Sequence, residues 1–186
     1  MIRNSLYILV LTLLAFFSFS CRKTGPGCVG SSGEMRYEER TPPAGVDSLE
    51  ILGEMDVFLS QSPSPRLYLH SGENLLPGIE TRQTGRKLTI EDFNTCSFLR
   101  DMGLRTLVFV TLSNYRYISF HSSGLIQSKD TIRSDTFSIQ CREGAGSVNL
   151  LLNTGFCALI QHSGTGAVDF TAKGTSGTVF ILCNGY

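Results

Sequence analysis

Four carboxylates in the C-terminal half of this sequence have the chemistry that glycan hydrolysis or elimination requires: Asp130, Asp135, Glu143 and Asp169. Such reactions need two or three carboxyl groups, or a carboxyl and basic groups, held together on one face of the fold. These four stand at unrelated offsets within the repeat described below, so we do not expect them to converge. The chain also lacks a Gly-x-Ser-x-Gly elbow, a phosphate loop and a calcium loop. We therefore expect no enzymatic activity and no cofactor.

Metal binding is the second chemistry to weigh, because the chain has three histidines and six cysteines. No Cys-x-x-Cys pair is present, and the histidines are scattered. In the repeat register His121 falls in one column with Cys141 and Gln161, which supplies one histidine and one cysteine at best. We expect solvated or hydrogen-bonded histidines and no metal site.

The cysteines of the repeat raise the question of disulfides in an exported chain. Cys141 and Cys157 fall at inward positions, which favours small buried hydrophobic residues. A bridge between Cys157 and Cys183, or between Cys28 and Cys96, stays open because the spacing supports neither.

Four aromatic residues could form a patch that stacks on sugar rings: Phe109, Tyr115, Tyr117 and Phe120. They lie in register with apolar neighbours such as Val108 and Ile118. Packing in the core or in a cap is therefore the favoured interpretation.

The element that must position all of these residues is a glycine-spaced repeat. Its glycines are Gly124, Gly144, Gly164 and Gly185, about 20 residues apart. Such a period with strand-like composition predicts a solenoid of stacked β rungs. Glycine suits the corners because it turns there without a steric penalty from a Cβ atom.

Apolar residues recur at matching distances from these glycines, so we expect each rung to hold two short strands with alternate side chains inward. The expected columns are Val148 with Val168, Leu150 with Phe170, Phe137 with Cys157, and Ile139 with Leu159.

The region before the repeat shows strict period two, which predicts half-buried strands. The first runs from Leu49 to Leu59, with Gly53 as a structural glycine at a bulge or bend. Further strands are expected over 66–70, 78–84, 87–91 and 105–113. A short helical excursion is expected near 92–102.

Residues 1–20 have the pattern of a signal peptide, in which a basic residue is followed by an apolar run from Leu6 to Phe17. The run is shorter than the ~20 residues of a membrane span. Cys21 follows directly. Cleavage before it with lipid on its thiol would give a lipoprotein, and plain cleavage a secreted chain; its position favours the lipoprotein. Residues 21–36, rich in Gly, Ser and Pro, predict a flexible tether.

The charges balance, with 16 Lys plus Arg against 16 Asp plus Glu. A neutral chain without a basic stripe has no electrostatic footprint for nucleic acid. We expect no nucleic-acid partner.

Three motifs carry a resemblance to a known family: Gly53-Glu54-Met55-Asp56-Val57-Phe58-Leu59, Glu73-Asn74-Leu75-Leu76-Pro77-Gly78-Ile79-Glu80 and Asn94-Thr95-Cys96-Ser97-Phe98-Leu99-Arg100, followed by the glycine-punctuated rungs. The chain from about Tyr37 onward resembles the head GIN domain family, adhesin-like domains common in lipoproteins of Bacteroidetes-type bacteria. The resemblance implies a right-handed, single-stranded, parallel β-helix-like solenoid over residues 37–186. Relatives usually continue past the position of Gly185, which leaves open whether this chain is a fragment.

The combined interpretation is an exported lipoprotein of the bacterial cell envelope, anchored to the membrane by its N-terminal lipid and facing the periplasm or the cell surface. Its all-β domain is expected to be a non-catalytic binding or adhesion module for a glycan or an envelope protein. The alternative is a scaffold that self-associates through an open end of the solenoid. A carbohydrate-active enzyme is the third and least favoured class.

Overall fold

The computed structural model describes residues 31–41, 44–94, 105–121, 123–144, 146–162 and 168–183. In this part of the chain the fold is all-β, as predicted, apart from one 3-10 turn, η1 (Leu76–Gly78). The strands are β1 (Met35–Arg40), β2 (Ser48–Leu52), β3 (Met55–Gln61), β4 (Arg66–Gly72), β5 (Ile79–Thr84), β6 (Lys87–Asp92), β7 (Thr106–Leu112), β8 (Tyr117–His121), β9 (Leu125–Ser128), β10 (Ile132–Glu143), β11 (Gly146–Gln161) and β12 (Val168–Cys183).

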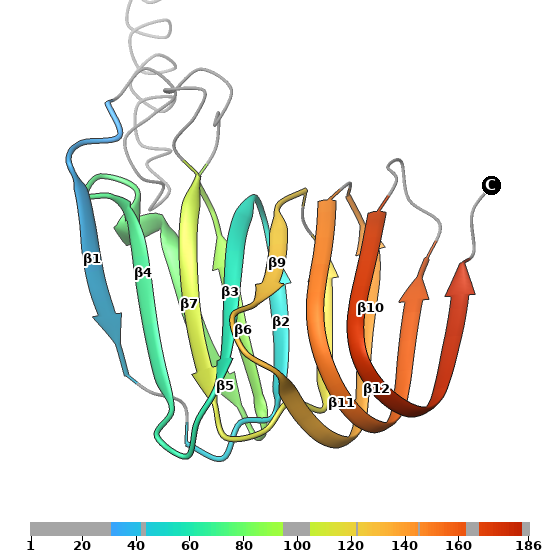
Figure 1. Ribbon diagram of the computed structural model, residues 1–186. Coiled ribbons are helices and arrows are strands. Elements are labelled where there is room, and N and C mark those ends of the chain that lie inside the picture. Colours follow the sequence, from blue (N-terminus) through green and yellow to red (C-terminus); the bar gives the residue numbers. More distant parts are fainter. Residues whose placement is uncertain are drawn as a thin grey trace, which may run out of the picture.

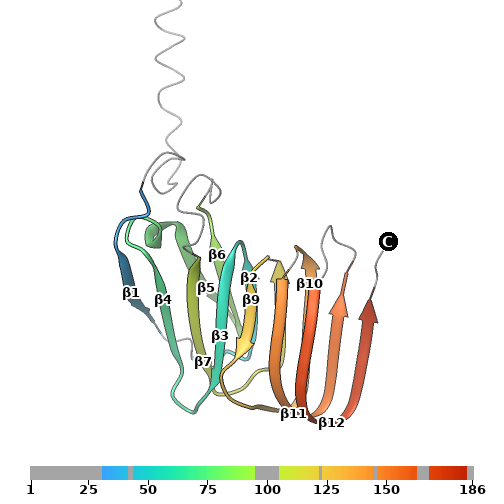
Figure 2. The same cartoon turned by 45° about the horizontal axis from the view of Figure 1, so that its top comes forward.

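The strands form one sheet in the order β1-β4-β7-β3-β9-β11-β10-β8-β2-β6-β5, with β12 added to β11. The sheet curves into a nearly closed, barrel-like shape, so that two layers of strands face each other (Figures 1 and 2). We call the layer that contains β4, β7, β3 and β9 the front layer. The long strands β11 and β12 bend along their length and so contribute to both layers (Figure 1).

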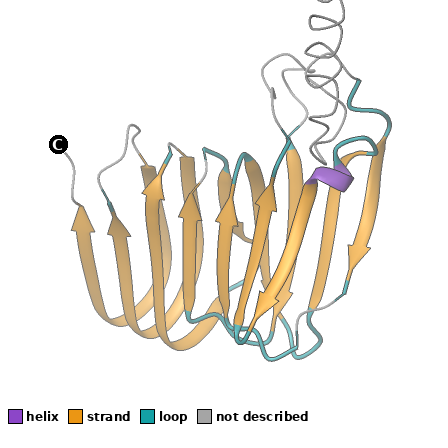
Figure 3. Cartoon of the chain, turned by 180° about the vertical axis from the view of Figure 1, so that it is seen from behind, coloured by secondary structure: helices purple, strands orange, loops and turns teal. Residues whose placement is uncertain are grey.

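The sheet is mixed, which corrects the expectation of a purely parallel solenoid. Pairs β1–β4, β4–β7 and β5–β6 are antiparallel, and the other pairs are parallel. Short connections explain the reversal, because a two-residue turn at Gly85 and Arg86 can join only antiparallel neighbours. Figure 3 shows η1 in the connection between β4 and β5.

The predicted first strand is in fact two strands, β2 and β3, separated by Gly53 and Glu54. Gly53 has φ of +101°, a conformation that side chains with a Cβ rarely adopt. The chain therefore turns a corner here instead of bulging within one strand. The alternation itself is as expected, since Leu49, Ile51 and Met55 are all fully buried.

Parallel pairing of β10 with β11 confirms the predicted columns in this pair of strands. Phe137 lies opposite Cys157 and Ile139 opposite Leu159, with 20 residues between partners. All four side chains are buried.

Pairing of β11 with β12 differs from the prediction, because partners are 22 residues apart. Phe170 lies opposite Val148, and Ala172 opposite Leu150, so the expected columns Val148–Val168 and Leu150–Phe170 are wrong by two residues. The reason is a connection between β11 and β12 that is two residues longer than that between β10 and β11. An even shift keeps the pleat in phase, so inward positions stay inward.

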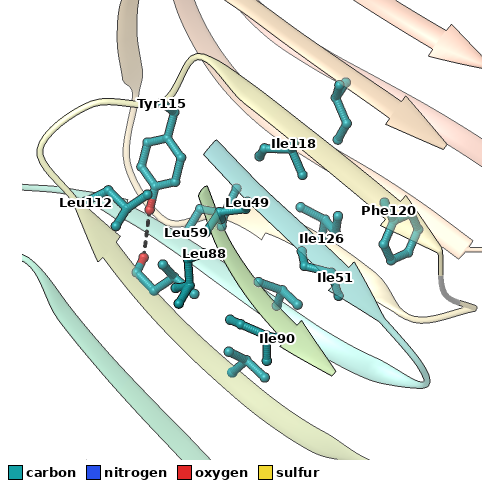
Figure 4. Close-up of a cluster of buried hydrophobic side chains, with 14 of the residues drawn as sticks. Leu49, Ile51, Leu59, Leu88, Ile90, Leu112, Tyr115, Ile118, Phe120 and Ile126 are labelled. Atoms are coloured by element: carbon teal, nitrogen blue, oxygen red, sulfur yellow. Dashed lines mark hydrogen bonds between the residues drawn. The ribbon is translucent and has the colours of Figure 1, made fainter. Parts of the chain in front are cut away.

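The core lies between the two layers and is built from the inward residues of both. Figure 4 shows Leu49, Ile51, Ile118, Phe120 and their neighbours packed together, and each of these four is fully buried. Burial of this kind contributes about 1.5–3 kcal/mol per large side chain.

Three expectations fall wholly or partly outside the described residues: the signal peptide 1–20, lipid attachment at Cys21, and most of the helical excursion near 92–102. Of that last segment, Asp92 ends β6. Strand β1 begins at Met35, two residues before the expected domain start at Tyr37. No helix among the described residues has the length and apolar character that crossing a membrane requires.

Candidate functional site

Aromatic side chains gather on the outer surface of the front layer. In the register of adjacent strands, Tyr68 of β4 lies opposite Phe109 of β7, and Phe109 lies opposite Phe58 of β3. Their neighbours along each strand point into the core, since Val108 and Val110 are buried. The three rings therefore face outward and are half-buried. We call this row, together with Lys129, the outer aromatic row.

The two phenyl rings of the row pack on each other. Phe58 and Phe109 have ring centroids 5.2 Å apart and planes 17° apart. The ammonium group of Lys129 lies 4.5 Å from the Phe109 centroid and 5.5 Å from the Phe58 centroid. This distance is typical of a cation–π interaction. In the part of the chain that the structure describes, no carboxylate lies within ion-pair distance of Lys129.

A second pair of rings lies on the same surface, nearer the sheet edge. Tyr37 of β1 stacks on His70 of β4, with centroids 4.0 Å apart and planes 10° apart. Tyr37 is 70% exposed. The Nδ1 atom of His70 is buried without a hydrogen-bond partner. The tyrosine ring is therefore held flat against the surface and open to solvent.

Polar side chains continue the outer aromatic row across the sheet. Gln127 of β9 lies opposite Phe58, and Asn149 of β11 lies opposite Gln127. Both side chains are exposed. Neighbouring strands are about 4.8 Å apart, so this surface offers rings and then amides at regular intervals.

Two shallow polar hollows lie at the edge of the sheet where the strands turn. One, of about 580 Å³, is lined by residues that include Gln61, Asp130 and Arg133. The other, of about 390 Å³, is lined by residues that include Asp135 and Asn153. The polar groups of the first hollow largely bond to each other: the Asp130 carboxylate accepts the backbone N–H of Gln61 at 3.1 Å. We therefore assign this network a role in holding the corner.

The back layer carries a serine, a histidine and a glutamate close together. Ser119 Oγ lies 3.3 Å from His121 Nε2, and Glu50 lies opposite Ser119 on the neighbouring strand. The Glu50 carboxylate, however, accepts hydrogen bonds from Lys87 Nζ at 2.8 Å and Thr89 Oγ1 at 3.0 Å. The hydrogen bond from Lys87 outweighs burial and lowers the pKa of Glu50. The carboxylate is committed to this ion pair.

The four predicted carboxylates are not brought together in the described structure. Asp130 and Asp135 line different hollows. The side chains of Glu143 and Asp169 lie outside the described residues.

The histidine column is wrong in part. His121 lies opposite Glu143, whereas Cys141 lies opposite Phe120. The predicted partner of Cys141, Gln161, is confirmed. Among the described residues no three His, Cys, Asp or Glu side chains form a group that could hold a metal ion.

Cys141 and Cys157 are both 2% exposed and unbridged, which confirms them as small buried residues. Burial raises the pKa of both thiols. Both are therefore held as neutral thiols in the core.

Of the predicted turn glycines, Gly144 has φ of +112° at the turn between β10 and β11. A Cβ atom on Gly124 would collide with the carbonyl oxygen of Met55, so this glycine is needed for close approach of two strands. Gly164 and Gly185 lie outside the described residues.

The four aromatic residues singled out in the sequence do not form one patch. Tyr115 and Phe120 are fully buried; Tyr117 is on β8 of the back layer, whereas Phe109 faces outward on the front layer. Sequence reasoning missed Phe58, because its outward position shows in the alternation but its partner does not.

The family model described as "Putative auto-transporter adhesin, head GIN domain" matches residues 46–186. Three solved structures are similar in fold, each described as a "putative adhesin". The first, from Bacteroides fragilis NCTC 9343, is 10% identical, with a TM-score of 0.54 over 87% of this chain and 96% of that chain. The second, from Parabacteroides merdae ATCC 43184, is 11% identical, with a TM-score of 0.51 over 86% and 98%. The third, from Parabacteroides distasonis ATCC 8503, is 14% identical, with a TM-score of 0.55 over 82% and 68%. No curated protein sequence matches the chain.

Proposed function

We propose that this chain, which belongs to the head GIN domain family, is a non-catalytic binding module of the bacterial cell envelope. The family description and the descriptions of similar structures as adhesins support this class of function. The single observation that carries the proposal is the outer aromatic row, whose three rings face solvent on a rigid sheet. Clustered aromatic rings outside the core mark interaction sites in soluble domains.

We further propose that β10, β11 and β12 are rungs of a right-handed, β-helix-like solenoid. The support is their parallel pairing with partners 20 and 22 residues apart. Such stacking repeats each outward residue at intervals of about 4.8 Å, which suits broad and shallow contacts.

Export through residues 1–20 and lipid attachment at Cys21 complete the proposal. Acyl chains on Cys21 would hold the module at the membrane, since each buried CH₂ contributes about 0.8 kcal/mol. Cells grown with labelled palmitate should give a labelled protein, and the Cys21→Ser variant should lose the label. Label that persists in the variant would contradict the anchor.

Binding is tested with the mature chain on a glycan array and on immobilised envelope proteins. We expect binding to at least one class, and the Phe58→Ser and Phe109→Ser double variant should lose it. A matched control is the exposed residue Arg82 on β5, whose change to Gln leaves the front layer intact. Absence of any binder at high micromolar concentration, or binding that the double variant retains, would contradict the proposal.

Self-association through β12 is a second candidate, favoured by the exposure of two core-directed side chains. Val179 and Ile181 are 53% and 64% exposed, although Cys157 and Leu159 opposite them are buried. Among the described strands β12 pairs only with β11, so its other edge could accept a strand. Sedimentation should then show concentration-dependent assembly that Ile181→Lys reduces. A monomer at all concentrations would remove this candidate.

A further inference from the structure

We propose that the outer aromatic row binds an acidic glycan, with sugar rings against the aromatic side chains and a carboxylate or sulfate paired with Lys129. This inference rests on the proposed binding function and specifies the ligand of the same surface. It commits to one ligand chemistry, which the following features support.

Recognition on this surface must come from side chains. Strands β4, β7, β3 and β9 each have both edges paired within the sheet, so their backbone groups are already used. An extended peptide that adds a strand to a sheet edge has no free edge here. A ligand on this surface is therefore held by stacking, hydrogen bonds from side chains and charge.

The aromatic groups supply the stacking. Tyr68, Phe109 and Phe58 lie on three adjacent strands, so the row extends over about 10 Å. The C–H face of a pyranose ring is apolar and flat, and it packs on an aromatic ring while its hydroxyls stay free. Mutual packing of the phenyl rings keeps the surface ordered before a ligand arrives.

The charge of the surface supplies the preference for an acid. Lys129 contacts only ring faces in the described structure. Five other cations in the same part of the chain each have a carboxylate within 3.5 Å: Arg36, Arg40, Arg86, Lys87 and Arg105. The ammonium of Lys129 is thus available to an external anion.

Further cations on the same outer surface have no printed carboxylate partner and would extend the binding track. Arg66 precedes Tyr68 by two residues on β4 and points the same way. Lys173 of β12 lies opposite the outward residue Leu151 of β11. Opposing charge comes from Asp130 beside Lys129 and from Glu39 opposite Tyr68, and the Asp130 carboxylate already accepts the N–H of Gln61.

The amides of Gln127 and Asn149 follow Phe58 at one and two strand intervals. Amide groups donate to and accept from sugar hydroxyls. Rings, a cation and amides in one line match a linear sugar acid better than a polynucleotide, because the chain has no net charge with which to hold many phosphates.

The test is calorimetric titration of the mature chain with oligogalacturonate and with its fully methyl-esterified form, which removes the charge and keeps the sugar. We expect the acid to bind and the ester to bind at least about tenfold more weakly. Lys129→Gln should reduce affinity for the acid to the level of the ester, and Lys129→Arg should preserve it. Phe109→Leu should weaken both ligands, while Arg82→Gln should change neither.

Equal binding of acid and ester, or wild-type affinity in Lys129→Gln, would overturn the inference. Tighter binding of a single-stranded oligonucleotide than of the acid would also overturn it. If neutral glycans or envelope proteins bind while the acid does not, the inference fails and the binding function stands. If no ligand of any class binds, both fail. Each variant is a surface change, and circular dichroism spectra matching wild type would show that it folds.

Discussion

The side-chain amide of Gln61 makes two hydrogen bonds to the backbone of Arg133, as a neighbouring strand would. The N–H of Arg133 donates to Gln61 Oε1 at 2.7 Å, and Gln61 Nε2 donates to the Arg133 carbonyl at 2.8 Å. Gln61 Nε2 also lies 3.1 Å from the carbonyl oxygen of Ser113. One side chain thus ties together three segments at the corner where the strands turn.

Replacing Gln61 should therefore loosen this corner. We expect Gln61→Leu to lower the free energy of unfolding by about 1–3 kcal/mol, since backbone groups lose their partners. Gln61→Glu should be at least as harmful, because a carboxylate cannot donate to the carbonyls of Ser113 and Arg133. Urea denaturation measures both. Wild-type midpoints in both variants would show that water replaces the amide without cost.

Close strand packing at Gly124 leads to a second prediction. A Cβ atom there would collide with the Met55 carbonyl oxygen and lie 2.7 Å from its carbon. Gly124→Ala should destabilise the fold by about 1–3 kcal/mol through overpacking. Gly85 gives a matched control, because it has φ of +60° with open space around it, and Asn tolerates that conformation. Gly85→Asn should change stability by no more than about 0.5 kcal/mol. Equal thermal midpoints for the two variants would contradict this account.

Tyr115 predicts a loss of stability at alkaline pH. The side chain is fully buried, and its hydroxyl lies 2.8 Å from the carbonyl oxygens of both Ser60 and Val110. Burial raises the pKa of Tyr115. A raised pKa means that its contribution is complete below the unfolded value of about 10 and is lost as pH rises through the folded value.

Tyr115→Phe should therefore be less stable at pH 7, by about 1–2 kcal/mol, and should lose less stability above pH 10 than the wild type. Urea denaturation across this pH range measures both effects. Identical pH profiles for variant and wild type would remove Tyr115 as the source.

Asp47 predicts the opposite pH dependence. Burial alone would raise the pKa of Asp47, but hydrogen bonds from Arg86 and Ser48, with the charges of Arg86 and Arg116, outweigh it and lower the pKa. The Arg86 Nε to Asp47 Oδ2 distance is 2.9 Å. A lowered pKa contributes stability above the unfolded value of about 3.9, and this is lost as pH falls through the folded value.

Asp47→Asn should thus destabilise the protein at pH 7 and flatten its loss of stability below about pH 4. Thermal unfolding from pH 7 to pH 2.5 is the measurement. A variant whose melting temperature falls in acid as steeply as that of the wild type would contradict the assignment.

Alternation within each strand was predictable, and so were its consequences. The pleat sends successive side chains to opposite faces, so the inward positions of Ile51 and Val57 show in the local sequence. The burial of Cys141 and Cys157 was predicted from the same pattern, combined with the 20-residue period. The parallel pairing of β10 with β11 followed too, because equal connections keep equivalent residues level.

What the sequence left open was which strands are neighbours. Phe58, Phe109 and Lys129 come from three distant segments, and they meet only because β3 pairs with β7 and with β9. Hydrogen bonds between strands use backbone groups that are the same in nearly every residue, so side-chain periodicity carries little information on lateral pairing.

By itself, then, the sequence determined the all-β class, the inward and outward sets of side chains, and the 20-residue columns of β10 and β11. The tertiary structure decided the antiparallel pairs, the 22-residue step to β12 and the outer aromatic row. The physical reason is that side-chain direction is a local property of each strand, whereas strand order and register depend on connection lengths and on packing of the whole sheet.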